Sequence, residues 1–98
     1  MKNFRTYQLA KSLYQMSRDI KLEGAFKNQF ERAILSIPLN LAEGSAKPTR
    51  RDRRKFYFIA LGSLREVQAI LDLGQATPCM LKQADILGAH LYRLCHRC

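Results

Sequence analysis

The stretch Ser36–Phe56, SIPLNLAEGSAKPTRRDRRKF, decides the predicted fold of this chain. It opens inside an apolar helix, is interrupted between Gly44 and Pro48, and resumes as a helix whose first turns are dense in arginine. We expect Gly44 to end the first helix in the left-handed conformation, which glycine adopts most easily. Thr49, followed three residues later by Asp52, is typical of a helix N-cap. The stretch therefore predicts two helices joined by a short loop.

The helix before this loop is predicted over residues 26–43. Apolar residues recur along it at steps of four and three and cover nearly its whole circumference, so we expect it to be the most enclosed helix. Pro38 lies in its interior, removes one amide donor and predicts a local bend. One polar line follows the helix and consists of Arg32, Ser36, Asn40 and Glu43. This line is either a solvated strip or a network that ties the helix to the next one through Ser63 or Glu66.

Three further helices complete the predicted architecture. Residues 4–21 carry two neighbouring apolar seams, which indicate either a wide core stripe or contact with another subunit. Residues 50–73 include the small residues Ala60, Gly62 and Ser63, which would let a neighbouring helix approach closely. Thr77–Pro78 predicts the start of a last helix that continues to the C-terminus. Since no alternating strand pattern competes, the predicted fold class is all-α, an antiparallel up-down-up-down four-helix bundle in one domain over residues 1–98.

The chain is strongly basic. Its 98 residues include 17 Lys and Arg against 8 Asp and Glu, which gives a formal net charge of +9. This excess favours an anionic partner, with nucleic acid first and an acidic protein or a membrane surface second. A basic protein without such a partner is the other interpretation of the same composition.

The cations concentrate where the helix after the loop begins. A helix N-terminus already carries positive dipole charge, so exposed cations there cost about 0.3–1 kcal/mol each. A sequence that breaks this rule indicates function, and free amides together with cations suit phosphate groups. The predicted nucleic-acid-binding residues are Lys47, Arg50, Arg51, Arg53, Arg54 and Lys55. The alternative is a solvated basic turn that binds nothing. Tyr57 and Phe58 follow this run, and we expect both to pack in the fold rather than to stack on bases.

No constellation for catalysis is found. The chain has no Gly-rich phosphate loop and no Ser-His-Asp set, and neither His90 nor His96 has an Arg at the spacing of helical ribonuclease domains. We therefore expect no enzymatic activity and no catalytic residues. Cys95 and Cys98 form a C-x-x-C half-site for zinc, but Cys79 would lie roughly 24 Å away along the same helix. No metal and no cofactor are expected.

The sequence also predicts where the protein works. No apolar run approaches the ~18 residues of a membrane span, and the N-terminus carries charge throughout, unlike a signal peptide. The three cysteines all lie near the C-terminus rather than spread as a disulfide framework. We therefore expect a reducing, cytoplasmic setting and no membrane partner.

Three segments resemble a known family: YQLAKSL (Tyr7–Leu13), RAILSIPLNLAEG (Arg32–Gly44) and FYFIALGSLRE (Phe56–Glu66). They are similar to the four-helix-bundle proteins encoded by intervening sequences of large-subunit ribosomal RNA genes, and the similarity covers about residues 4–75. The resemblance implies a closed bundle and assembly into a basic pentameric ring. Distant relatives with this assembly are the accessory variability proteins of diversity-generating retroelements, which work with a reverse transcriptase and RNA. The resemblance implies no catalytic residue.

The family motif also implies roles for individual residues. It implies structural or interface roles for Arg32, Ser36, Pro38, Asn40, Glu43, Gly44, Gly62, Ser63 and Glu66. The chain departs from the family in two places, because residues 22–29 lack the usual proline and Ile34 replaces a more usual alanine.

Together these observations predict a non-enzymatic homo-oligomer, a pentamer by the resemblance, that binds RNA or other nucleic acid through its basic surface. The alternative is a protein adaptor, a ring that docks an acidic protein or a partner similar to a reverse transcriptase.

Overall fold

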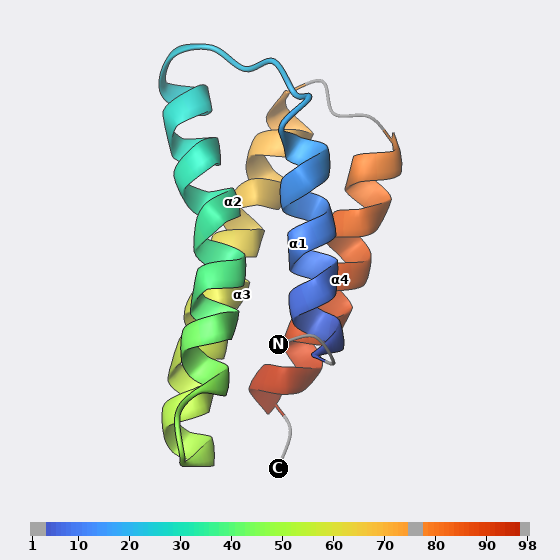
Figure 1. Ribbon diagram of the computed structural model, residues 1–98. Coiled ribbons are helices and arrows are strands. Elements are labelled where there is room, and N and C mark those ends of the chain that lie inside the picture. The colour runs from blue at the N-terminus through green and yellow to red at the C-terminus, as the bar shows by residue number, and fades with distance from the viewer. Residues whose placement is uncertain (1–3, 75–77, 97–98) are drawn as a thin grey trace.

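A computed structural model describes residues 4–74 and 78–96 of the chain. These residues form four helices, α1 (Arg5–Ser17), α2 (Gly24–Ser45), α3 (Arg50–Leu73) and α4 (Pro78–His96), and no strand. Successive helices run in opposite directions, and α1 packs on α2 and α4 while α3 packs on α2 and α4 (Figure 1). Each helix therefore has two neighbours, and the prediction of an all-α, antiparallel up-down-up-down four-helix bundle is confirmed.

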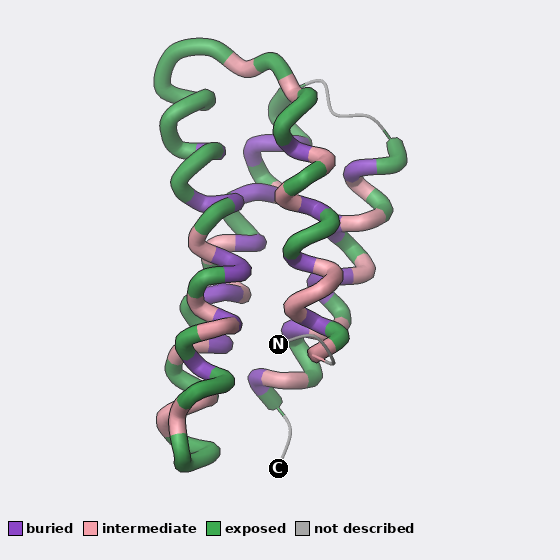
Figure 2. Tube along the Cα trace, in the orientation of Figure 1, coloured by how far each residue is buried: buried purple, intermediate pink, exposed green. Residues whose placement is uncertain are grey.

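The core lies along the axis of the bundle, where all four helices contribute leucines (Figure 2). Leu41, Leu64, Leu87 and Leu91 have no exposed surface, and Leu13 is almost as deeply buried. Each such side chain stabilises the fold by roughly 1.5–3 kcal/mol relative to an exposed one. The spacing that predicted the helices therefore also selects the buried residues.

Helix α1 is shorter than predicted and ends at Ser17 rather than near residue 21. Beyond it, the amides of Asp19 and Ile20 donate hydrogen bonds to carbonyls three residues earlier, so the chain continues as a tight turn. The two apolar seams of α1 both belong to the core. Leu13 is buried in it, and Leu9 and Met16 pack against it in a partly buried state. Within a single chain, the two seams of α1 therefore form one wide core stripe.

Helix α2 was predicted to be the most enclosed, and it does contain more buried residues than α1, α3 or α4, but a single chain does not enclose it fully. Its outer side carries the exposed leucines Leu35 and Leu39, the latter 57% exposed. Its nearly continuous apolar pattern covers more of the circumference than two neighbouring helices can bury. The helix continues through Pro38, which is buried, and runs on to Ser45, and the bend predicted at Pro38 stays a prediction.

The predicted role of Gly44 as a left-handed helix end is also wrong. Gly44 lies inside α2, and among the described residues the only positive φ is that of Gly24, at the start of the helix. Gly44 is buried where α2 crosses the beginning of α3. A Cβ at this position would lie 2.9 Å from Cβ of Phe56, 3.0 Å from Cε1 of Tyr57 and 3.2 Å from the carbonyl oxygen of Arg53. Close approach of two helices, and not backbone conformation, requires the glycine.

The predicted starts of α3 and α4 agree with the structure. The hydroxyl of Thr49 accepts a hydrogen bond of 3.2 Å from the amide of Asp52, which confirms Thr49 as the N-cap of α3. Pro78 is the first residue of α4, as predicted, while Thr77 lies outside the described residues.

In the parts of the chain that the structure describes, no helix is both long enough and apolar enough to cross a lipid bilayer.

Replacing Gly44 tests the contact between α2 and α3. We expect Gly44→Ala to lower the free energy of unfolding by about 1–3 kcal/mol, because the added methyl group overlaps Phe56 and Tyr57. Urea denaturation followed by circular dichroism measures the change. Gln29→Ala is the control, since Gln29 is an exposed residue of the same helix, and it should change the stability by less than about 0.5 kcal/mol. Equal effects of the two substitutions would contradict the assignment.

Candidate nucleic-acid interface

The basic segment, defined here as Lys47–Lys55, contains the end of the α2–α3 connection and the first turns of α3. Two of its six predicted site residues hold the connection in place. Nη1 of Arg53 donates a hydrogen bond of 3.0 Å to the carbonyl oxygen of Lys47. Nζ of Lys47 lies 3.5 Å from a carboxylate oxygen of Glu43 and 5.2 Å from the centre of the Phe56 ring. Lys47 and Arg53 thus fold the connection back onto α2 and α3.

The remaining four predicted site residues face outward. Arg50, Arg51, Arg54 and Lys55 are exposed, and together with Phe58 they line a hollow of about 410 Å³. A second hollow, of about 330 Å³, adjoins it between the start of α3 and Leu94 of α4 and shares Arg50 and Arg54. Both hollows adjoin the helix N-terminus, whose partial positive charge adds to that of the guanidinium groups. The arrangement can bind anions such as phosphate groups.

Tyr57 and Phe58 take different positions. Tyr57 is buried, as predicted, and burial raises the pKa of its hydroxyl, while the charge of Arg53 lowers that pKa by a smaller amount. Phe58 is 45% exposed, so the prediction that it packs into the fold is wrong. The sequence contains the signal for this exposure, because Phe58 follows Arg51 by seven residues and Arg54 by four. This spacing places Phe58 on the helix face that carries the cations.

Phe58 belongs to an aromatic group that the sequence analysis missed. The ring centre of Phe58 lies 5.6 Å from that of His96, edge to face, and the rings of His96 and Tyr92 stack with centres 4.0 Å apart. Nδ1 of His96 also lies 2.8 Å from the carbonyl oxygen of Tyr92. The last turn of α4 therefore meets the beginning of α3 through three aromatic rings, next to the basic segment.

A small polar network joins α2 to α3. The hydroxyl of Ser63 donates a hydrogen bond of 2.9 Å to Oγ of Ser36. The side-chain amide nitrogen of Asn40, Nδ2, donates to Oγ and to the carbonyl oxygen of Ser36. Within the polar line of α2, Ser36 and Asn40 thus form the predicted network through Ser63. The other two members of the line, Arg32 and Glu43, are exposed, as the solvated strip predicts. Glu66, the other predicted partner, is exposed.

The other residues of the family motif lie around this network. Pro38 and Gly44 are buried, whereas Arg32, Glu43, Gly62 and Glu66 are exposed. A Cβ at Gly62 would meet nothing within 4 Å, so the close helix approach predicted there is not made inside the chain. Leu39 of α2 and Ile59 of α3 are also exposed, Ile59 to 50%. We call these two residues and Gly62 the α2–α3 outer face. Leu35 is exposed as well, but it lines a hollow between α1 and α2.

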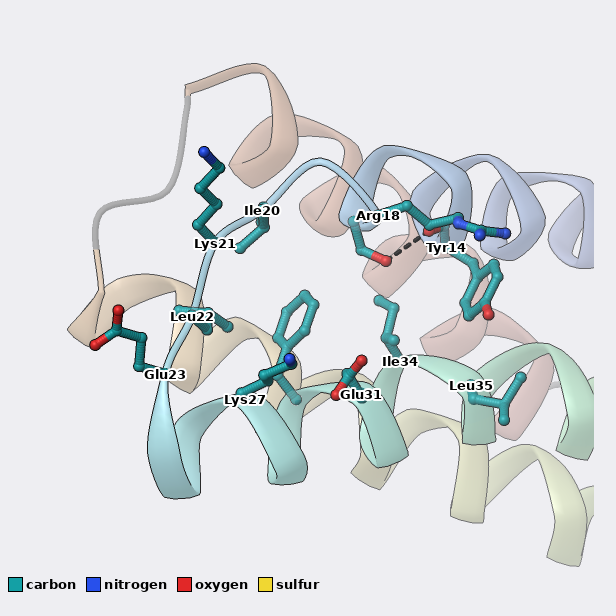
Figure 3. A pocket seen from close by; sticks show the side chains of 12 residues that line it. Tyr14, Arg18, Ile20, Lys21, Leu22, Glu23, Lys27, Glu31, Ile34 and Leu35 are labelled. Carbon is teal, nitrogen blue, oxygen red and sulfur yellow. Dashed lines mark hydrogen bonds between the residues drawn. The ribbon is translucent and has the colours of Figure 1, made fainter.

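A further hollow, of about 650 Å³, lies between α1, α2 and the connection that joins them (Figure 3), at the end of the bundle opposite the basic segment (Figure 1). Its walls include Tyr14 of α1, Arg18 and residues 20–23 of the connection, and Lys27 and Glu31 of α2. Its lining mixes both signs of charge with apolar side chains. The sequence analysis placed no site residue there.

Comparison with known proteins decides the family. The family model of the 23S rRNA-intervening sequence protein matches residues 4–93, which is nearly the whole chain. The chain belongs to this family. The resemblance identified from the sequence is confirmed, and the match extends beyond residue 75 through most of α4. No match to a curated protein was found.

The cysteines of this intervening-sequence family member differ in their surroundings. Cys79 is exposed and Cys95 is buried, and both are free thiols. Burial raises the pKa of Cys95 to about 11, an effect that the charge of Arg54 opposes. Cys98, the other half of the C-x-x-C pair, lies outside the described residues. Within residues 4–74 and 78–96, no three His, Cys, Asp or Glu side chains come together as a metal site.

Among the described residues, His90 belongs to no group of side chains that could hold a metal ion. The pKa of His90 is lowered, first by partial burial and then by the positive charges of Arg93 and Arg5. It is therefore a neutral side chain at pH 7 on the middle of α4.

The raised pKa of Cys95 makes the stability of the fold depend on pH. The unfolded chain ionises this thiol near pH 9.0 and the folded chain near pH 11, so stability should fall as the pH rises through this window. We expect the free energy of unfolding to fall by up to about 1.4 kcal/mol per pH unit more in the natural chain than in Cys95→Ala. Urea titrations from pH 8 upward measure this difference. Cys79→Ala, at an exposed thiol, should follow the natural chain, and parallel curves for all three proteins would refute the assignment.

Proposed function

We propose that the chain is a non-enzymatic, homo-oligomeric protein that binds nucleic acid, with RNA as its preferred partner. The observation that carries this proposal is the set of four exposed cations, Arg50, Arg51, Arg54 and Lys55, around one hollow at the N-terminus of α3. Phosphate groups fit this arrangement because they accept hydrogen bonds from guanidinium groups and interact favourably with a helix N-terminus.

The preference for RNA rests on the family. Its members are described as 23S rRNA-intervening sequence proteins, and the net charge of +9 suits a polyanionic partner. If each of the four cations neutralises one phosphate, counterion release predicts a strong dependence on salt. The logarithm of the binding constant should fall by about 0.7 per phosphate for each tenfold rise in salt, or about 2.8 in total.

The basic segment supports this proposal because its backbone is fixed before any ligand arrives. The Thr49 cap, the bond from Arg53 to the carbonyl oxygen of Lys47 and the Lys47–Glu43 ion pair hold the start of α3. Cations that stand on an ordered helix lose little backbone entropy on binding.

Self-assembly is proposed from the α2–α3 outer face. Leu39 and Ile59 expose apolar surface on the two helices, and the missing side chain of Gly62 leaves room for a second helix. Arg32, Glu43 and Glu66 surround this surface with both signs of charge, which suits contact between identical copies. A ring of five copies is the assembly that the family resemblance implies. The free thiols of Cys79 and Cys95 support a reducing, cytoplasmic setting for it.

Charge reversal tests nucleic-acid binding. The combined replacement of Arg50, Arg51, Arg54 and Lys55 by Glu should abolish binding of a short labelled RNA, because each substitution removes a phosphate contact and adds a repulsive charge. Fluorescence anisotropy over a series of salt concentrations measures the affinity and the salt slope. The matched control reverses four exposed lysines elsewhere, Lys11, Lys21, Lys27 and Lys82, and should keep most of the affinity at an equal net charge.

The same variants separate the two functional classes. If the site variant and the control lose RNA affinity equally, binding depends only on the net charge and the proposed site is wrong. If the natural chain binds RNA with no salt dependence, the phosphate mechanism is wrong. If the site variant loses a protein partner while RNA binding persists, the protein adaptor replaces the nucleic-acid binder.

Substitution in the α2–α3 outer face tests self-assembly. We expect the natural chain to elute as an oligomer in size-exclusion chromatography with in-line light scattering. Leu39→Asp and Ile59→Asp should shift the mass to that of a single chain, because each places a charge in a desolvated contact. Ala89→Asp adds the same charge to an exposed position of α4 and should leave the oligomer intact. A natural chain that elutes as a monomer would refute this part of the proposal.

A further inference from the structure

Three aromatic rings gather where α4 ends beside the beginning of α3. Phe58 is 45% exposed and Tyr92 is 53% exposed, and the ring of His96 lies between them, edge to face with Phe58 and stacked on Tyr92. His96 is exposed as well. We call these three side chains the aromatic platform. Single exposed apolar residues are common on protein surfaces, but a contiguous group of rings is not.

The aromatic platform continues directly into the cationic surface. Phe58 is itself part of the wall of the 410 Å³ hollow, beside Arg51 and Arg54. On α3, Arg51, Arg54 and Phe58 follow each other at steps of three and four residues and therefore share one helix face. Tyr92 and His96, four residues apart, share one face of α4 in the same way. One surface thus offers charges for phosphates and ring surfaces for something flat and apolar.

Unpaired nucleobases are the ligand groups that match this combination. Proteins that bind single strands pair a basic groove, which follows the backbone, with aromatic side chains on which successive bases stack. The bases of a duplex are stacked on each other, so their faces are not accessible to protein rings. We propose that the aromatic platform binds bases of a single-stranded nucleic acid by stacking, while Arg50, Arg51, Arg54 and Lys55 bind its phosphates. This inference rests on the proposed function and specifies its ligand as single-stranded.

A second copy of the chain fits this surface less well. The adjacent charged residues at the start of α3 are four cations, so a copy that docks here by its own basic surface would be repelled. The α2–α3 outer face carries apolar residues with both signs of charge around them and is the better surface for self-contact.

Three probes of equal length separate stacking from charge. They are a short single-stranded RNA, an abasic strand with the same number of phosphates, and a duplex of the same sequence, each measured by fluorescence anisotropy at one salt concentration. The natural chain should bind the base-bearing strand at least about fivefold more tightly than the abasic strand, since stacking of one base contributes at least that factor. It should also favour the single strand over the duplex, counted per phosphate.

Variants of the platform assign this preference to its rings. Phe58→Ala and Tyr92→Ala should each weaken binding of the base-bearing strand by at least about fivefold and leave binding of the abasic strand unchanged. Phe58→Tyr and Tyr92→Phe keep the ring faces and should keep the affinity. Phe26→Ala is the matched control, because Phe26 is 47% exposed at the opposite end of the bundle, and it should bind all three probes as the natural chain does.

The outcomes distinguish this inference from the proposed function. If base-bearing and abasic strands bind equally to all these proteins, stacking is refuted while phosphate binding stands. If no probe binds the natural chain, or if the charge-reversed variant binds as well as the natural chain, the proposed function itself fails. If Phe58→Ala or Tyr92→Ala changes the mass in light scattering, the platform is an interface between copies and the inference is wrong.

Discussion

The contact between α2 and α3 at Gly44 is the constraint on which the interface depends. The two helix backbones approach so closely there that a Cβ on Gly44 would lie 2.9 Å from Cβ of Phe56. Real Cβ atoms avoid such distances, so the crossing is possible only with glycine. Because Phe56 and Tyr57 directly follow the cations, the same contact fixes the height and rotation of the basic first turns of α3. The position of the charges is thus set by packing in the core.

The short α2–α3 connection links this packing to the surface that we propose for nucleic-acid binding. Only residues 46–49 separate the two helices, and within the connection a carbonyl oxygen is held by Arg53. Lys47 and Arg53 of the basic segment make contacts within the chain. The other four cations of the segment lie on α3 and are exposed. The function that we propose therefore uses a surface whose geometry is already determined by the fold.

Much of this architecture could be predicted from the sequence because apolar spacing carries it. The steps of three and four that identify the helices also select Leu13, Leu41, Leu64 and Leu91 as core residues, and these are buried. Thr49 could be predicted as a cap because capping is local chemistry between residues three apart. The polar network through Ser36 and Ser63 could be stated only as an alternative, since its partners are far apart in sequence.

The failed prediction for Gly44 and the missed aromatic platform depend on how closely helices approach each other, which no local pattern encodes. The sequence around Gly44 is typical of a helix C-terminus, yet the glycine is needed because α2 packs closely on α3 there. Phe58 stands in an apolar run, and only its register relative to Arg51 and Arg54 separates it from its buried neighbour Tyr57. The aromatic platform needs residues from α3 and from the last turn of α4, and it becomes visible only when the antiparallel arrangement brings these helix ends together.

The location of Tyr92 and His96 in the terminal turn of α4 has a thermodynamic consequence. Helix ends open with smaller free energies than helix centres, so the geometry of the platform is coupled to the fraying equilibrium of one turn. A ligand that binds only the closed turn shifts this equilibrium toward the helix, and the energy needed to order the turn is subtracted from its affinity. The helix content of this last turn and the fraction of chains with bound ligand are therefore linked. A change that stabilises the turn raises the affinity, and bound ligand raises the helix content.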